Sequence, residues 1–321
     1  MSENKKKPMI ILTGPTAVGK TDLSIQLAKA INGEIISADS MQVYRHMDIG
    51  SAKITPEEMQ GVTHYMIDEL EPDEEFHVVR FVTMAKEYLK EIYADGKIPI
   101  IAGGTGFYIQ ALLYDIDFTE QQCDETYRRQ LEDLAREHGA EYLHGILREV
   151  DPASAEAIHA NNIKRVIRAL EFYHLSGKKI SEHNETERQK QSPYNFAYFV
   201  LTDERAKLYE RIDRRVDAMI EAGLVEEVKK LKSMGCSREM VSMQGLGYKE
   251  ILAYLDGGCT LEEAVYIIKR ETRHFAKRQL TWFKRERDVI WLDKQAFGYD
   301  DAAILTDMIS ILEEKEIISH E

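Results

Sequence analysis

Residues 9–21, with the sequence MIILTGPTAVGKT, decide the fold of this chain of 321 residues. The first five residues of the stretch form an apolar run that predicts a buried β-strand. The strand runs into GPTAVGKT, which has the GxxxxGK[ST] pattern of a phosphate-binding loop. Residues 22–31 carry regularly spaced apolar side chains without a breaker, as the helix after such a loop requires. The sequence therefore predicts an α/β fold, a P-loop NTPase-like parallel sheet flanked by helices.

The residue types of this loop suit a phosphate group. Gly14 and Gly19 allow a backbone path that turns successive N–H groups inward. Lys20 supplies a point charge for the terminal phosphates, and the Thr21 hydroxyl is placed to hold a magnesium ion. The expected phosphate-binding residues are Gly14, Pro15, Thr16, Ala17, Val18, Gly19, Lys20 and Thr21. A diphosphate or triphosphate with Mg²⁺ is the predicted ligand.

Polar residues follow two further predicted strands. Residues 34–38 (EIISA) lead into Asp39 and Ser40, and residues 98–102 (IPIIA) lead into the turn GGTG, which contains Thr105. In open α/β sheets, ligands bind beyond the carboxyl ends of the strands, so both turns face the phosphate loop. Asp39 is therefore a candidate for chemistry, although Asp and Ser are equally typical of a cap or turn. The GGTG turn is also open to two interpretations, a tight connection or a contact with the ligand.

The character of the sequence changes between residues 118 and 193. Strand patterns vanish there, charge rises, and residues 127–137 and 161–175 have helical spacing. We expect a helical insertion at 118–193 in a catalytic core made of residues 1–117 and 194–321. The cluster of Lys164, Arg165 and Arg168 is most simply a solvated helix face.

In the second part of the core, the spacing of apolar residues predicts a strand at 196–201, a helix at 207–234, a strand at 289–292 and a helix at 302–315. A further long helix begins at the capping box of Thr260 and Glu263. Residues 269–287, which form the second half of this helix and the segment directly after it, include eight basic and two acidic residues. The basic side chains form a stripe that suggests contact with a polyanion, either the diphosphate or an RNA backbone.

Composition excludes several classes of protein. The net charge of −14 argues against a protein that holds nucleic acid by bulk electrostatics, although it leaves room for local patches. The chain has three cysteines and no HExxH or CxxC pattern, so neither a disulfide framework nor a protein metal cage is expected. The polar residues 1–7 do not suit a signal peptide, and no stretch has the length of a membrane span. A cytoplasmic protein without membrane contact is expected.

A set of motifs in order resembles the tRNA dimethylallyltransferase (tRNA isopentenyltransferase) family of bacterial type. The motifs are GPTAVGKT, ISADSMQVYRHMDIGSAK, IIAGGTGFYI, NNIKRVIRALE, RIDRRVDAMIEAGLVEEV, GLGYKEI and TRHFAKRQLTWF, and the resemblance runs from residue 9 to about residue 293. The resemblance implies transfer of a dimethylallyl group from dimethylallyl diphosphate to the exocyclic amine of the adenosine 3′ of the tRNA anticodon. It also implies a magnesium requirement and release of diphosphate.

The resemblance also implies roles for single residues. Asp39 would be the general base and Thr105 would assist at the reacting end, while Lys20 and Thr21 would take the diphosphate and its metal. The residues expected to contact the anticodon loop of the tRNA are Asp39, Ser40, Met41, Gln42, Thr105, Asn161, Asn162, Ile163, Lys164 and Arg165. Our own extension of the diphosphate site adds Arg273, Lys277 and Arg278 from the basic stripe. A monomer is expected.

Two other functions use the same loop. A small-molecule kinase of the adenylate-kinase type would bind ATP there, but it would need a catalytic basic lid and gives no reason for the polar turns after two strands. A non-catalytic nucleotide switch that binds RNA would keep the phosphate loop and would not need Asp39.

Overall fold

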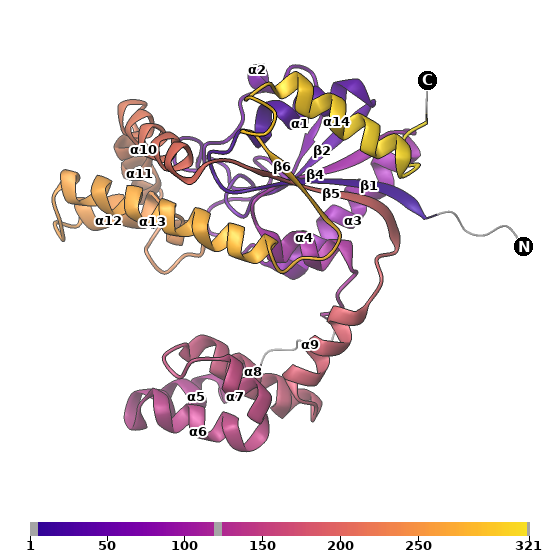
Figure 1. The fold of residues 1–321 in the computed structure, drawn as a ribbon. Coiled ribbons are helices and arrows are strands. Elements are labelled where there is room, and N and C mark those ends of the chain that lie inside the picture. Colours follow the sequence, from indigo (N-terminus) through magenta and orange to yellow (C-terminus); the bar gives the residue numbers. More distant parts are fainter. Residues whose placement is uncertain (1–5, 119–123, 320–321) are drawn as a thin grey trace, which may run out of the picture. The chain divides into compact units, whose positions relative to one another are not determined.

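The computed structural model describes residues 6–118 and 124–319 and divides the chain into two compact units (Figure 1). The larger unit comprises Met1–Leu113 and Pro193–Glu321, and the smaller comprises Tyr114–Ser192. Most of the predicted insertion, 118–193, falls in the smaller unit. Its assignment as a tRNA-binding domain stays a prediction.

The larger unit is built on a six-stranded sheet in the order β3-β2-β4-β1-β5-β6. The strands are β1 (Lys7–Thr13), β2 (Gly33–Ala38), β3 (His64–Tyr65), β4 (Ile98–Gly103), β5 (Tyr194–Thr202) and β6 (Val289–Asp293). Every pairing between neighbours is parallel. β1 lies between β4 and β5, and its last five residues are buried, which explains its unbroken apolar run. The predicted α/β fold with a parallel sheet is confirmed.

Helices cover both faces of the sheet (Figure 1). On one face α1 (Lys20–Ala30) packs against α14 (Asp301–Glu314), and on the other α3 (Val78–Ala94) packs against α4 (Gly106–Leu113). Alternate residues of β1, Ile10 and Leu12, share a buried apolar cluster with residues of α1 and α14. This arrangement fixes α1 directly behind the phosphate loop, with its N-terminus at the carboxyl end of β1.

The remaining helices of the larger unit lie between β5 and β6 in sequence. They are α10 (Arg205–Glu221), α11 (Leu224–Ser233), η1 (Ser242–Gln244), α12 (Tyr248–Leu255) and α13 (Leu261–Phe283). The exception is the short helix α2 (Pro56–Met59), which precedes β3. The single helix predicted at 207–234 is wrong. Gly223 adopts φ 101°, a left-handed conformation that ends α10 and starts α11 in a new direction.

The pattern of residues 64–70 also suggests a short strand, but only His64–Tyr65 pairs with β2. Met66 and Asp68 have φ of 64° and 55°, so the backbone leaves the extended region directly after Tyr65. The sequence gives no sign of these turns, because a positive φ is usually predicted from a glycine and neither Met66 nor Asp68 is one. The segment therefore forms a short edge strand followed by a loop.

The smaller unit consists of helices with their own apolar core. They are α5 (Glu125–His138), α6 (Ala140–Val150), α7 (Pro152–Ala157), α8 (Ile163–Ser176) and α9 (Ile180–Gln189). Leu131, Leu143, Leu147, Val166 and Leu170 form the centre of this core. Arg128 of α5 donates two hydrogen bonds to Glu171 of α8, whose side chain is only 1% exposed. This ion pair, in which only the carboxylate is buried, ties α5 to α8.

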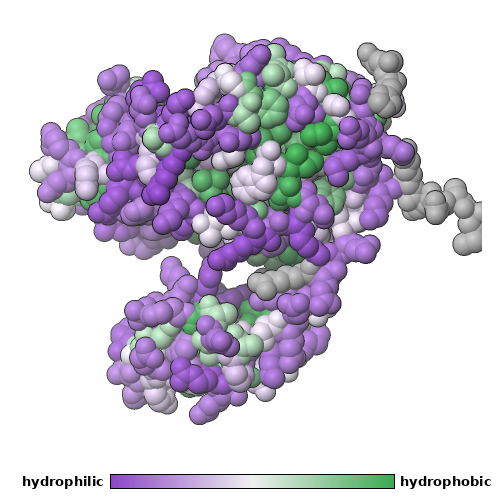
Figure 2. All heavy atoms as spheres, viewed as in Figure 1, coloured by the Kyte–Doolittle hydropathy of each residue, from purple (hydrophilic) through white to green (hydrophobic). Residues whose placement is uncertain are grey.

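The face drawn in Figure 2 is mainly hydrophilic, with hydrophobic side chains gathered around α14 and β6 of the larger unit. Among the described residues, no helix combines the length and the apolar character that crossing a bilayer requires.

Candidate active site at the carboxyl ends of the strands

Three turns of the larger unit line one cavity of about 110 Å³. The phosphate loop contributes Lys20 and Thr21, the segment after β2 contributes Asp39, and the turn after β4 contributes Gly103 and Gly104. Helices α10 and α13 add further side chains to its wall. The carboxyl ends of the parallel strands β1, β2 and β4 thus converge on one site, as the sequence predicts.

The phosphate loop folds tightly over the N-terminus of α1. Gly14 has φ 151°, and a Cβ atom there would lie 2.3 Å from the Leu201 carbonyl oxygen, so only glycine fits. Gly19, with φ 97°, is the N-cap of α1 and leaves the first N–H groups of the helix without a side-chain cap. Lys20 Nζ donates to the carbonyl oxygens of Gly14 at 3.0 Å and of Pro15 at 2.8 Å. A cation and free helix N–H groups therefore converge here, as an anion site requires.

The electrostatics of Lys20 favour an anion. Burial, and to a smaller extent the charge of Arg215, lower the pKa of its ammonium to about 7, although the charge of Asp39 acts in the opposite direction. A phosphate placed beside Nζ would stabilise the charged form of this lysine. Lys20 and Arg215 thus lie together in the cavity, and a bound polyanion would stabilise the charged forms of both.

Asp39 stands directly after β2 and is half-buried in the cavity wall. Its Oδ1 accepts a 2.8 Å hydrogen bond from the backbone N–H of Met41, which fixes the orientation of the carboxylate. Within the described ranges 6–118 and 124–319, Asp39 forms no ion pair, and Oδ2 accepts no hydrogen bond. One carboxylate oxygen is therefore held by the backbone, and the other is open to a substrate.

The turn after β4 lies against the end of β2. The Thr105 N–H donates to the Ala38 carbonyl at 3.1 Å, next to Asp39. A Cβ atom on Gly103 would lie 2.4 Å from the same carbonyl oxygen, so this approach requires glycine. The contact brings the Thr105 and Asp39 turns together, although Gly103 and Gly104, rather than Thr105, line the cavity.

The other residues predicted after β2 behave differently from one another. Gln42 lines the cavity, where its Oε1 accepts from Ser37 Oγ and its Nε2 donates to the Ala52 carbonyl, both at 3.3 Å. Ser40 is half-buried in the turn beside Asp39. Met41 packs against Gly245, so closely that a Cβ atom on this glycine would lie 2.6 Å from Cε of Met41. Of these three residues, Gln42 is placed to meet a ligand in the cavity.

Helix α10 supplies an arginine pair that sequence reasoning did not assign to the site. Arg215 lines the cavity and its Nη1 donates to Thr16 Oγ1 at 3.5 Å, while Arg211 Nε donates to the Ala17 carbonyl at 2.9 Å. Burial lowers the pKa of Arg215, and the nearby charge of Asp39 opposes this effect. The two residues are four positions apart, so they lie on the same side of α10, whereas the side chain of Arg214 is 70% exposed and pairs with Glu210.

Gln279 of α13 is a second residue that the sequence did not single out. Its Oε1 accepts from the Thr16 N–H at 2.9 Å, and its Nε2 donates to the Gly104 carbonyl at 3.0 Å. The side chain is 6% exposed and lines the cavity. The only available signal was its place on the apolar side of a helix rich in basic residues.

The residues that we added to the diphosphate site lie elsewhere. Arg273 Nη1 is held by both carboxylate oxygens of Asp213, at 2.5 and 2.7 Å. Lys277 and Arg278 are exposed and line a second groove together with Trp282. None of the three lines the phosphate-loop cavity as the described residues define it. Their contact with a diphosphate stays a prediction.

The predicted tRNA contacts of the smaller unit surround the start of α8. Asn162 is the N-cap of this helix, and Ile163 is its first residue. Asn161, Asn162, Lys164 and Arg165 are exposed, and Ile163 is half-buried. These side chains form a polar and basic surface at a helix N-terminus.

The cavity suits magnesium only together with a phosphate ligand. In the described part of the chain, no cluster of three or more His, Cys, Asp or Glu side chains is arranged to hold a metal. Thr21 lines the cavity at the start of α1, next to Lys20. Mg²⁺ typically takes few protein ligands and completes its shell with phosphate oxygens and water. Thr21 with a bound diphosphate fits this pattern.

Comparison with known proteins identifies the family. The model of the IPP transferase family matches residues 42–286. The chain is 68% identical over 312 residues to a tRNA dimethylallyltransferase of Lachnoclostridium phytofermentans, covering 97% of this chain and 99% of the relative. It is 53% identical over 296 residues to a tRNA dimethylallyltransferase of Acetivibrio thermocellus, covering 92% and 95% of the two chains.

Solved structures of similar proteins support the same family assignment. A tRNA isopentenylpyrophosphate transferase from Bacillus halodurans has a TM-score of 0.73 and 46% identity and covers 97% of this chain and 98% of its own. A eukaryotic dimethylallyltransferase, described as acting on tRNA, has a TM-score of 0.79 and 30% identity, covering 98% of this chain and 81% of its own. The chain therefore belongs to the IPP transferase family, which includes the tRNA dimethylallyltransferases.

Proposed function

We propose that this protein is a prenyltransferase that moves a dimethylallyl group from dimethylallyl diphosphate to tRNA. The acceptor is the exocyclic amine of the adenosine 3′ of the anticodon, and diphosphate is released. The observation that carries the proposal is the convergence of Lys20, Arg215 and Asp39 on one cavity. Family membership disfavours the alternative of a small-molecule kinase, because the relatives at 68% and 53% identity are dimethylallyltransferases.

The cations of the cavity serve the leaving group. An allylic diphosphate departs readily once its negative charge is neutralised, and charge stabilisation is then the main task of the protein. Lys20, Arg215 and the N–H groups at the start of α1 supply that stabilisation. We add Arg215 to this role because it lines the cavity, whereas Arg273 is held by Asp213, and Lys277 and Arg278 line a separate groove.

Magnesium supplies further positive charge to the diphosphate when it is bound, and Thr21 is the protein residue that would hold it. Thr16, whose hydroxyl accepts from Arg215, and Gln279, which holds the Thr16 N–H, keep the loop in shape around the phosphates. The protein thus binds the leaving group chiefly through backbone groups and fixed cations.

Asp39 serves the nucleophile. The adenine amine is a weak nucleophile with a delocalised lone pair, and it loses a proton as the new carbon–nitrogen bond forms. The open Oδ2 of Asp39 can accept that proton, while Met41 N–H holds Oδ1 in place. Thr105 lies in the adjoining turn and is proposed to assist at the same end of the site.

The tRNA must present its adenosine outside the stack, because the reacting amine is not accessible inside a stacked anticodon loop. We propose that Ser40, Met41 and Gln42 contact the extruded base and its neighbour, since Gln42 already lines the cavity. The exposed residues Asn161, Asn162, Lys164 and Arg165, with Ile163, are proposed to contact the tRNA from the smaller unit.

One assay tests this function directly. The protein is incubated with radiolabelled dimethylallyl diphosphate, Mg²⁺ and unmodified tRNA, and in parallel with ATP and a nucleoside. The proposal expects label in the tRNA and no phosphorylated nucleoside. Phosphate transfer from ATP without prenylation of tRNA would contradict it.

A further inference from the structure

Residues 40–54 form an irregular segment that borders the cavity at several points. All of these residues are described, and the only backbone pairing of strand type among them is the isolated bridge of Tyr44 with Leu70. Gln42, Ser51 and Ile54 nevertheless line the cavity. Backbone hydrogen bonds to residues 68–70 hold residues 42–45, whereas the backbone of residues 48–50 is held mainly by side chains.

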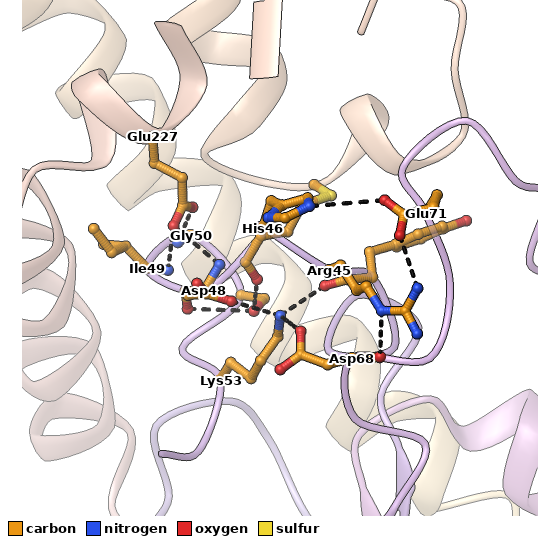
Figure 3. Close-up of polar contacts among 12 residues, drawn as sticks. Arg45, His46, Asp48, Ile49, Gly50, Lys53, Asp68, Glu71 and Glu227 are labelled. Carbon is orange, nitrogen blue, oxygen red and sulfur yellow. Dashed lines mark hydrogen bonds and ion pairs between the residues drawn. The ribbon is translucent and has the colours of Figure 1, made fainter. Parts of the chain in front are cut away.

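Glu227 of α11 is the most connected of these side chains. Its Oε2 accepts hydrogen bonds from the backbone N–H groups of Asp48 at 2.9 Å and Ile49 at 2.8 Å. Its Oε1 accepts from the N–H of Gly50 at 3.1 Å and from the hydroxyl of Tyr248 at 2.8 Å. Figure 3 shows the carboxylate facing Ile49 and Gly50 from the neighbouring helix. One carboxylate thus satisfies three consecutive backbone donors, with charge-assisted hydrogen bonds.

Lys53 holds the same segment by its own side chain, which is only 4% exposed. Its Nζ donates to the Tyr44 carbonyl at 2.6 Å, to Asp48 Oδ1 at 2.6 Å and to Asp68 Oδ1 at 2.5 Å (Figure 3). Asp48 is therefore fixed twice, through its N–H by Glu227 and through its carboxylate by Lys53. The segment has little freedom to shift around this point.

Tyr248 completes the arrangement by packing. A Cβ atom on Gly50 would lie 2.5 Å from Cζ of Tyr248, so the backbone of Gly50 rests directly on the ring. The Tyr248 side chain is fully buried, and its hydroxyl holds Glu227. The ring and the carboxylate together define where residues 48–50 can lie.

We propose that Glu227 is a positioning residue for the acceptor side of the active site. Its carboxylate holds residues 48–50, which lead directly into Ser51 and Ala52. Ser51 lines the cavity, and the Ala52 carbonyl accepts a hydrogen bond from Gln42, so Glu227 fixes both groups at the cavity. This inference rests on the proposed prenyl transfer, because it assigns residues 40–54 to the adenosine rather than to the diphosphate. In the described structure Glu227 makes no hydrogen bond to the phosphate loop, so we expect diphosphate binding to depend on it little.

The test is Glu227→Gln, with Glu226→Gln as the matched control. The amide keeps one acceptor but turns an NH₂ group toward backbone donors, so at least one N–H of residues 48–50 is left unpaired. We expect kcat/KM for tRNA to fall about tenfold or more, while the Kd of inorganic diphosphate with Mg²⁺ changes less than about twofold. The Glu226 side chain is 72% exposed and pairs only with Lys229 among the described residues, so its variant should match the wild type.

Backbone hydrogen exchange gives a direct reading of the segment. In Glu227→Gln, the amides of Asp48, Ile49 and Gly50 should exchange faster, with the amides of β1 and β4 unchanged. Unchanged kcat/KM for tRNA would overturn the proposal. An equal loss of tRNA turnover and diphosphate affinity would also overturn it, since that result indicates a general effect on stability.

A milder variant covers the case in which Glu227→Gln does not fold. Tyr248→Phe removes one of the four donors and keeps the ring, so a loss of about two- to threefold in kcat/KM for tRNA is expected, with diphosphate affinity retained. Wild-type turnover in a folded Tyr248→Phe would then overturn the inference. Failure of the wild-type protein to prenylate tRNA would instead contradict the proposed function itself.

Discussion

The backbone N–H of Thr16 donates a 2.9 Å hydrogen bond to Oε1 of Gln279, a residue 263 positions further along the chain. The Nε2 of the same amide donates to the Gly104 carbonyl at 3.0 Å. A Cβ atom on Gly104 would lie 2.2 Å from this nitrogen, so the glycine makes room for the amide. One side chain of α13 therefore joins the phosphate loop to the turn after β4.

Replacing Gln279 by Ala should weaken diphosphate binding. The change leaves the Thr16 N–H and the Gly104 carbonyl without their partner, at a cost of about 1–3 kcal/mol for each buried group. Titration calorimetry with diphosphate and Mg²⁺ should show an affinity about tenfold lower. Thr281→Ala is the control, since that exposed hydroxyl donates within its own helix, to the Lys277 carbonyl, and to no other described residue. Equal affinity in both variants would show that the bridge does not shape the loop.

Arg215→Met should reduce prenyl transfer about a hundredfold or more, because a fixed cation next to the leaving group is removed. Arg214→Met is the matched control on the same helix, since its side chain is 70% exposed and pairs with Glu210. Single-turnover rates with saturating tRNA measure the effect. Similar rates in the two variants would exclude Arg215 from the site.

The pH dependence of diphosphate binding should report on Lys20. Burial lowers the pKa of this lysine to about 7 from the ordinary value of 10.5, so the free protein holds it largely neutral above pH 7. A bound diphosphate restores the charge, and binding should therefore take up a proton at pH 8 and weaken as the pH rises further. Calorimetry in buffers of different ionisation enthalpy measures the uptake.

The control for this experiment is Lys20→Met, in which the proton uptake at pH 8 should disappear. Identical binding heats in all buffers for the wild type at pH 8 would mean that Lys20 is already charged in the free protein.

Local patterns made the centre of the fold predictable. The apolar run of β1, the glycines of the phosphate loop and the polar residues after β2 and β4 are each visible within a few residues, and parallel strands bring their ends together. Gly223 was within the predicted helix 207–234, but a glycine alone does not reveal that its φ is 101°. The break between α10 and α11 lies at this left-handed glycine.

The residues that were missed act over long distances in sequence. Arg215 and Gln279 reach Thr16 from α10 and α13, and no spacing rule connects them to the phosphate loop. The place of Arg273 in the basic stripe of α13 was visible in the sequence, but the stripe could not show that Asp213 stands opposite. Which cation meets the cavity is decided by tertiary packing.

The most direct test of the account is prenyl transfer by Asp39→Asn in a single turnover. The asparagine keeps an oxygen for the Met41 N–H but cannot accept the proton of the adenine amine. The account predicts that transfer falls at least about a hundredfold while tRNA still binds with wild-type affinity in a filter assay. Wild-type transfer by this variant would contradict the assignment of Asp39 as the base.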